Sequence, residues 1–138
     1  MNAFEYALCA AFIWGIVPIL EKIGLSKIDP LVGLFYRSFG VILGGVILGA
    51  FFLKGDQIRN VDLKTVSILL LSGFLASFVA QIFFYNGLKV GEVSRIVPIA
   101  GSFPLITFVL GVLIFGESIT LSKVVGLICI VAGVWFLK

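Results

Sequence analysis

The sequence predicts an all-α integral membrane protein built as a bundle of five transmembrane helices. Hydrophobic residues make up 61% of the 138 residues, the mean hydropathy is +1.24, and only 12% of the residues are charged. This composition leaves too little polar surface to cover a water-soluble domain. The apolar residues form five continuous runs and lack the strict alternation that the strands of a membrane barrel need, so helices are expected.

Each run is long enough, or nearly so, to cross a bilayer. A hydrocarbon core about 30 Å thick is spanned by roughly 20 helical residues. Three runs contain at most one charged residue, namely Leu31–Leu53, Thr65–Leu88 and Ile96–Gly116. Phe4–Leu25 and Leu121–Leu137 are shorter or contain more charge, and we predict that they also span the membrane.

The connections between the runs are short, which favours a single transmembrane domain over residues 1–138. Pro30 suits the start of the second helix, because the donor it lacks would be unpaired at that position anyway. Thr120 is placed to cap the last helix. The first run begins with Glu5, without Lys or Arg, and no small-residue cleavage pattern follows it, so we expect it to be retained rather than removed as a signal.

Several classes of function are not expected. Cys9 and Cys129 lie in apolar runs, and the sequence has no His and no CxxC motif, so neither a metal site nor a disulfide framework is predicted. The net charge of +3 is spread over short loops, which argues against nucleic acid as a partner. Dispersed carboxylates and the lack of a phosphate-binding loop argue against an enzyme, so no catalytic residue or cofactor is expected.

The basic residues give only a weak signal for orientation in the membrane. With five spans, one side would hold four Lys and Arg residues: Lys54, Arg59, Lys64 and Lys123. The other side would hold five, or six if Arg37 reaches the interface: Lys22, Lys27, Lys89, Arg95 and Lys138. Because an excess of Lys and Arg sets the cytoplasmic side, insertion in both orientations and insertion in one orientation both stay open.

Two charged residues fall inside predicted spans. Glu21 lies about five residues before the first turn, and Arg37 lies seven residues after Pro30, so the two side chains are expected at similar depth and within reach of each other. Charges at depth usually face a partner or a cavity, because exposure to lipid is costly. A structural ion pair and a role toward substrate or protons both remain open.

Proline and polar residues extend this candidate pathway. Pro18, Pro98 and Pro104 each lack the donor that would pair a carbonyl one turn earlier, so we expect kinks with free acceptors in the first and fourth helices. Polar residues on the third helix either join helices by hydrogen bonds or contact solute. The candidate substrate or ion pathway comprises Trp14, Pro18, Glu21, Arg37, Gln81, Tyr85, Pro98 and Ser102.

Glycine pairs indicate close helix packing, either within one chain or between copies. Gly40 and Gly44 lie four apart in the second helix, and Gly126 and Gly133 lie seven apart in the last helix. Small residues at such spacing let membrane helices approach closely.

Several short segments together resemble an EamA-type unit of the drug/metabolite transporter superfamily. They are Trp14-Gly15, Arg37, Tyr85-Asn86-Gly87-Leu88-Lys89 with Ser94 and Pro98, and Gly116-Glu117-Ser118-Ile119-Thr120 followed by Gly126 and Gly133. The chain is similar, more distantly, to the small multidrug resistance proteins. The resemblance implies half of a ten-helix carrier that is completed by a second copy, as a homodimer that is either parallel or antiparallel. The Gly126 and Gly133 pair is similar to the dimerising element of the small multidrug resistance proteins.

The resemblance implies a secondary transporter or exporter of a small metabolite or drug-like solute, working by alternating access in the cell membrane, with or without proton coupling. Glu117 matches the Gly-Glu position of the family, and we interpret it as structural because it lies before the last helix. Two alternatives remain open: a flippase or flippase subunit for a lipid-linked substrate, and a noncatalytic membrane scaffold subunit.

Overall fold

The protein is helical, and no strand occurs in the part of the chain that the structure describes. The structure is a computed structural model that describes residues 2–137, with the side chain of Gln57 left aside. Contacts between Cα atoms divide the chain into two compact units, Met1–Val90 and Gly91–Lys138, and each unit is described by itself. Lys138, which was counted above for orientation, lies outside the described residues.

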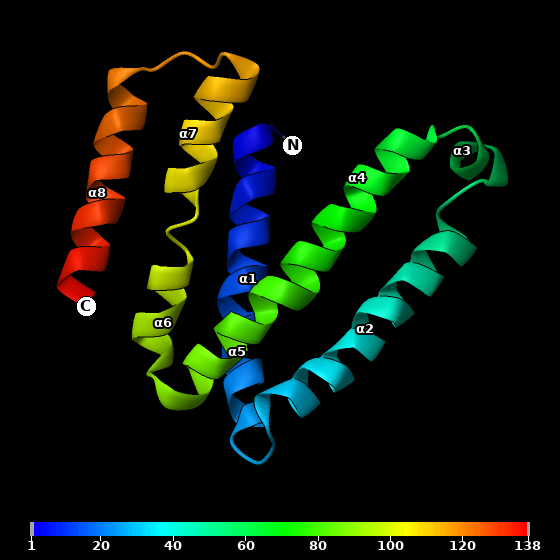
Figure 1. The fold of residues 1–138 in the computed structure, drawn as a ribbon, viewed down its shortest axis with the longest axis horizontal. Coiled ribbons are helices and arrows are strands. Elements are labelled where there is room, and N and C mark those ends of the chain that lie inside the picture. The colour runs from blue at the N-terminus through cyan, green and yellow to red at the C-terminus, as the bar shows by residue number, and fades with distance from the viewer. Residues whose placement is uncertain (1, 138) are drawn as a thin grey trace. The chain divides into compact units, whose positions relative to one another are not determined.

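The first unit contains two long helices, one short helix and a third long helical segment that includes a π-turn. These elements are α1 (Ala3–Leu25), α2 (Pro30–Phe51), α3 (Gly55–Arg59), α4 (Leu63–Phe74), η1 (Leu75–Val79) and α5 (Ala80–Val90) (Figure 1). The connection between the predicted second and third spans therefore contains α3, and the predicted third span continues through η1.

Side-chain caps fix where these helices begin. Asn2 and Glu5 form a reciprocal capping box at the start of α1. Asp29 accepts a hydrogen bond from the backbone N–H of Leu31, and Pro30 occupies the first turn of α2 as predicted. Asp62 caps α4, where hydrogen bonds from the side chain and the backbone of Thr65 lower the pKa of Asp62.

The second unit contains α6 (Val93–Ala100), α7 (Pro104–Phe115) and α8 (Leu121–Leu137). The predicted fourth span is present as Val93–Phe115, and the defect predicted from its prolines is an interruption at residues 101–103, between α6 and α7. Pro98 and Pro104, six residues apart, each lack a backbone donor, and Gly101 between them favours the break. Gly116 ends α7 in the left-handed conformation (φ 64°), which a glycine adopts without strain.

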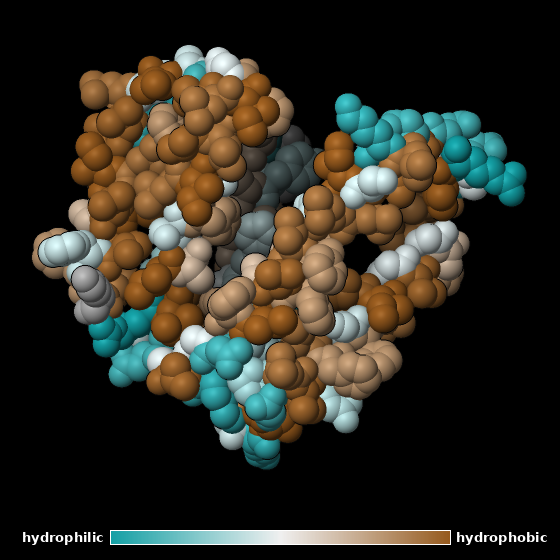
Figure 2. Space-filling view, in the orientation of Figure 1, coloured by the Kyte–Doolittle hydropathy of each residue, from teal (hydrophilic) through white to brown (hydrophobic). Residues whose placement is uncertain are grey.

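The helices have the length and composition of membrane spans. Four helical segments are long and apolar enough to cross a bilayer: Ala3–Leu25, Pro30–Phe51, Leu63–Val90 and Val93–Phe115. The fifth apolar helix, Leu121–Leu137, has 17 residues. Hydrophobic side chains cover most of the visible surface, and hydrophilic ones gather near helix ends and α3 (Figure 2). The predicted class, an all-α multi-pass membrane protein, is confirmed.

The first unit has a small core where α5 packs against α1 and α2. Among its described residues, Leu25, Leu34, Tyr85 and Leu88 form the buried hydrophobic core, and Pro18 and Pro30 are also buried. Gly33 lets α2 approach this core, since a Cβ added there would lie 2.7 Å from the Leu25 side chain and 3.4 Å from the Tyr85 ring. The helices of this unit therefore meet closely at the end that carries the turn between α1 and α2.

We predict that Gly33→Val destabilises the protein by about 1–3 kcal/mol, because the added atoms overfill the contact with Leu25 and Tyr85. Gly49→Val is the matched control, since a Cβ at that position of the same helix meets nothing within 4 Å. Thermal unfolding of the purified variants in detergent measures the difference. Equal melting temperatures for the two variants would contradict the close approach at Gly33.

Candidate functional site

An ion pair joins the first two helices below the surface of the first unit. The Nε of Arg37 on α2 lies 3.2 Å from the Oε1 of Glu21 on α1. The Glu21 side chain is only 9% exposed, and that of Arg37 is 30% exposed. The contact that the sequence suggested between these two residues is therefore present in the structure.

Two further donors from α5 reach the same carboxylate oxygen. Gln81 Nε2 donates to Glu21 Oε1 over 3.1 Å, and the Tyr85 hydroxyl donates to it over 3.0 Å. One oxygen atom thus accepts hydrogen bonds from two other helices. Such charge-assisted bonds are stronger than bonds between neutral groups, and together they hold the three helices around Glu21.

The π-turn helps to place the two α5 donors. Residues Leu75–Val79 form η1, directly before the segment that carries Gln81 and Tyr85. A π-turn contains one residue more than an α-turn and changes which face the following residues occupy. Gln81 and Tyr85 are four residues apart on one face of α5, and both point their donors at Glu21. We define Glu21, Arg37, Gln81 and Tyr85 as the Glu21 cluster.

The Glu21 cluster also contains an unsatisfied donor. Arg37 Nη1 is buried and has no hydrogen-bond partner within the described part of the chain. Leaving a buried donor unpaired costs about 1–3 kcal/mol, and more for a charged group. A fold held together by this ion pair alone would gain stability by pairing Nη1 as well, so the open donor distinguishes this site from a fully satisfied structural pair.

The structure places the remaining pathway residues as follows. Pro18 is buried one turn before Glu21, whereas the Trp14 side chain is 66% exposed. Pro98 lies inside α6 and Ser102 lies in the interruption after it, where its hydroxyl donates to the carbonyl of Ile99. These last two residues belong to the second unit. Within the first unit the structure thus brings together four of the predicted residues.

The glycine pairs have no close neighbours in the described chain. A Cβ added at Gly40, Gly44, Gly126 or Gly133 would meet no other atom within 4 Å. None of these glycines therefore provides a tight contact between helices of one chain.

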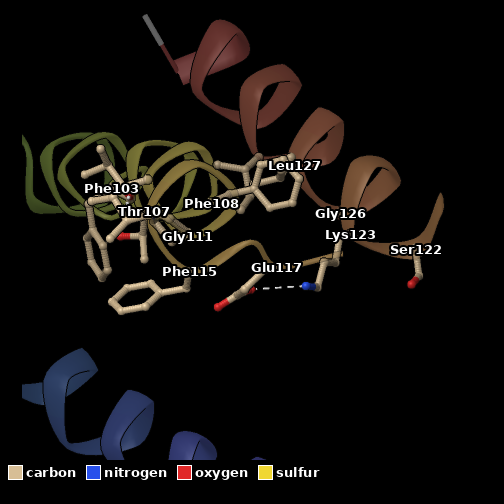
Figure 3. Close-up of a pocket in the computed structure, with 14 residues that line it drawn as sticks. Phe103, Thr107, Phe108, Gly111, Phe115, Glu117, Ser122, Lys123, Gly126 and Leu127 are labelled. Carbon is tan, nitrogen blue, oxygen red and sulfur yellow. Dashed lines mark hydrogen bonds and ion pairs between the residues drawn. The ribbon is translucent and has the colours of Figure 1, made fainter. Parts of the chain in front are cut away.

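The second unit has an apolar groove of about 720 Å³ between α7 and α8. Its lining includes Phe103, just before α7, Thr107 and Phe108 of α7, and Gly126 and Leu127 of α8. Figure 3 shows Phe108 next to Leu127 and the ion pair of Glu117 and Lys123 beside the groove. The two charged groups are 3.2 Å apart and are 54% and 39% exposed. Thr120 caps α8 weakly, through a 3.4 Å bond from the backbone N–H of Lys123.

Sequence reasoning missed the role of two lysines, which it counted only as loop charges. Lys22 of α1 donates to the carbonyl of Leu88 on α5, and Lys89 of α5 donates to the carbonyls of Leu25 and Ile28. Each lysine thereby pairs carbonyls at or next to the end of the other helix, where acceptors lack intrahelical partners. The available signal was their position in the last turns of their own helices, next to the Glu21 cluster.

Comparisons with known proteins agree with the helical membrane architecture. The profile of the EamA-like transporter family matches residues 3–138. An uncharacterized protein of Methanocaldococcus jannaschii is 28% identical over 99% of this chain and 96% of its own length. Uncharacterized transporters of Archaeoglobus fulgidus and Methanothermobacter thermautotrophicus are 22% and 28% identical, over 95% and 94% of this chain.

The chain spans less than half of these two transporters, 46% and 41% of their lengths. No solved structure matches the chain significantly. The family profile covers nearly the whole sequence and agrees with the apolar helices described above. The resemblance suggested by the sequence is thereby confirmed, and the chain belongs to the EamA-like transporter family of membrane proteins.

Proposed function

We propose that the protein is a secondary transporter of a small solute in the cell membrane, and that the Glu21 cluster is its binding site for solute or coupling protons. The observation that carries this proposal is a polar, charged cluster with an unsatisfied Arg37 donor inside otherwise apolar helices. Membership of a transporter family supports the class of function, and the charged cluster inside apolar helices supports this choice of site.

Depth in the membrane supports a functional interpretation of the cluster. Glu21 lies four residues before the end of α1, and Arg37 lies seven residues after the start of α2. At about 1.5 Å per residue, these positions are roughly 6 and 10 Å from the helix ends. Charged side chains become more costly with depth in the bilayer, so charges inside membrane spans tend to mark substrate and ion pathways.

The helices that hold the cluster also contain points where they can bend. Pro18 lies inside α1, one turn before Glu21, and removes one backbone hydrogen bond there. In the second unit, the helix is interrupted at residues 101–103. Discontinuous helices are common at the substrate and ion sites of secondary transporters. Binding at Glu21 would thus be coupled to bending of α1.

A homodimer would complete the carrier. The chain covers less than half of two transporter relatives, so a second copy would supply the missing length. The open glycine faces at Gly126 and Gly133 and the groove between α7 and α8 offer a surface for the second copy, because small residues permit close contact between membrane helices. The nearly balanced loop charges favour copies that insert in opposite orientations.

Substitution of Glu21 tests the proposed site. We expect Glu21→Gln to keep the neutral hydrogen bonds but to lower solute flux at least about tenfold, since the charge that binds Arg37 is lost. Flux is measured in proteoliposomes with a panel of labelled amino acids, organic cations and organic anions, and with a pH-sensitive dye inside the vesicles. Glu92→Gln is the matched control, because Glu92 is exposed and its side chain makes no cap bond to α6. Wild-type flux in a folded Glu21→Gln protein would rule out this site.

The dimer is tested by filling the glycine face of α8. We expect the wild-type protein to be a dimer in mild detergent and the Gly126→Val/Gly133→Val variant to be a monomer, because the added side chains keep the helices of two copies apart. Light scattering after size-exclusion chromatography measures the mass, with Gly49→Val as control.

Reporter fusions to the amino terminus test the arrangement of the copies. Signal from both compartments is expected for opposite orientations. A single orientation would contradict the antiparallel dimer, and a monomeric wild-type protein would contradict the dimer itself.

A further inference from the structure

We propose that the solute carries an anionic oxygen group, a carboxylate or a phosphate, and that this group binds Arg37 through the Nη side of its guanidinium. This inference rests on the proposed transport function and names the chemical class of the solute. It follows from the way in which the donors and acceptors of the Glu21 cluster are distributed.

The contact between Arg37 and Glu21 uses only a small part of the guanidinium. An arginine has five N–H donors in a planar fork and commonly binds a carboxylate through two parallel bonds. Here the contact runs through Nε alone, over 3.2 Å, and Nη1 is buried without an acceptor in the described chain. The side of the guanidinium that is best suited to bind a planar or tetrahedral oxyanion is therefore not used by Glu21.

The carboxylate of the cluster is, by contrast, well supplied with donors. Glu21 Oε1 accepts from Arg37, Gln81 and Tyr85, over 3.2, 3.1 and 3.0 Å. When Arg37 turns toward a ligand, Gln81 and Tyr85 still hold this oxygen. A cationic ligand would have to compete with three donors at Glu21, whereas an anionic ligand would satisfy a donor that has no partner.

The nearby lysines are engaged elsewhere. Lys22 and Lys89 donate to backbone carbonyls at the ends of α5 and α1. Among the described residues, Glu21 is the carboxylate that pairs with Arg37. The anion would thus be recognised mainly by Arg37.

Access to Nη1 requires a small movement. The atom is covered in this conformation, but the Arg37 side chain as a whole is 30% exposed, so rotation about its terminal bonds would present the Nη groups to a ligand. A single-point contact with Glu21 is easier to exchange than a bidentate one. Exchange of Arg37 between Glu21 and the solute anion would then link binding to the packing of α1 against α2.

The anionic oxygen group can belong to either of two ligands, a free small anion or the headgroup of an anionic lipid. The test therefore uses the full-length protein in phosphatidylcholine nanodiscs, with sodium acetate and inorganic phosphate as anionic probes at constant ionic strength. Acetamide is the neutral analogue of acetate, and tetramethylammonium is the cationic probe. A second set of nanodiscs contains phosphatidylglycerol. We measure the melting temperature of the protein with each probe and the affinity of each probe by equilibrium titration.

We expect acetate or phosphate to raise the melting temperature of the wild-type protein in a saturable manner, and acetamide to have no effect. Arg37→Lys should weaken this binding at least about tenfold, because Lys keeps the charge but loses the planar fork. Arg59→Gln is the control, since Arg59 is an exposed residue of α3.

A measurement on the wild-type protein covers the case in which Arg37→Lys does not fold. The sequence contains three arginines, Arg37, Arg59 and Arg95, so their side-chain signals in an ¹⁵N-arginine-labelled sample are assignable with the aid of two variants, Arg59→Gln and Arg95→Lys. We expect the anion to shift the Arg37 signal. A shift at Arg59 or Arg95 alone would overturn the proposal.

The other outcomes are equally decisive. Stabilisation by phosphatidylglycerol that depends on Arg37 supports the proposal with a lipid headgroup as the source. Binding of tetramethylammonium or acetamide, with none of acetate, phosphate or phosphatidylglycerol, overturns the anionic class but leaves transport standing. If no probe binds and no labelled solute moves in proteoliposomes, both the inference and the proposed function fail.

Discussion

The packing of the three long helical segments in the first unit depends on the carboxylate of Glu21. Arg37 of α2 and two donors of α5 meet on one of its oxygens, and the few buried apolar side chains of the unit lie on the same three helices. In a bilayer, apolar contact between helices provides little driving force, because lipid is as apolar as leucine. Hydrogen bonds and close backbone approach must then hold the helices together, and the Glu21 cluster and Gly33 provide both.

The same constraint explains why most apolar side chains remain exposed. Large residues such as Phe51 and Phe136 are more than three-quarters exposed in the described chain, which in water would cause aggregation and in a membrane provides contact with lipid. The polar interior is correspondingly small. A cluster that holds helices together and also carries an unsatisfied donor is suited to exchange partners, because every bond that a solute takes over weakens a contact between helices.

Much of the fold was predictable from the sequence, because hydropathy and helix length determine it. The ends of α1 and α8 and the start of α2 at Pro30 agree with the prediction. The interruption at residues 101–103 was not predicted, since proline predicts a defect but not whether a helix bends or breaks. Tertiary contacts also decided the roles of Lys22 and Lys89, because their positions in the last turns of α1 and α5 do not show which carbonyls they reach. Glu21 and Arg37 were recognisable because charges in apolar runs need partners, whereas the joint contact of Gln81 and Tyr85 with Glu21 depends on the packing of α5.

The central claim is that the Glu21 cluster serves transport and is more than a structural ion pair. The most direct measurement compares the stability and the solute flux of the neutral double variant Glu21→Gln/Arg37→Met with those of the wild-type protein. Replacing both members of a buried pair often leaves stability nearly unchanged, whereas removing one member costs about 3–5 kcal/mol. The account predicts a double variant that melts within a few degrees of the wild-type protein and transports no solute. A stable double variant that transports at the wild-type rate would contradict it.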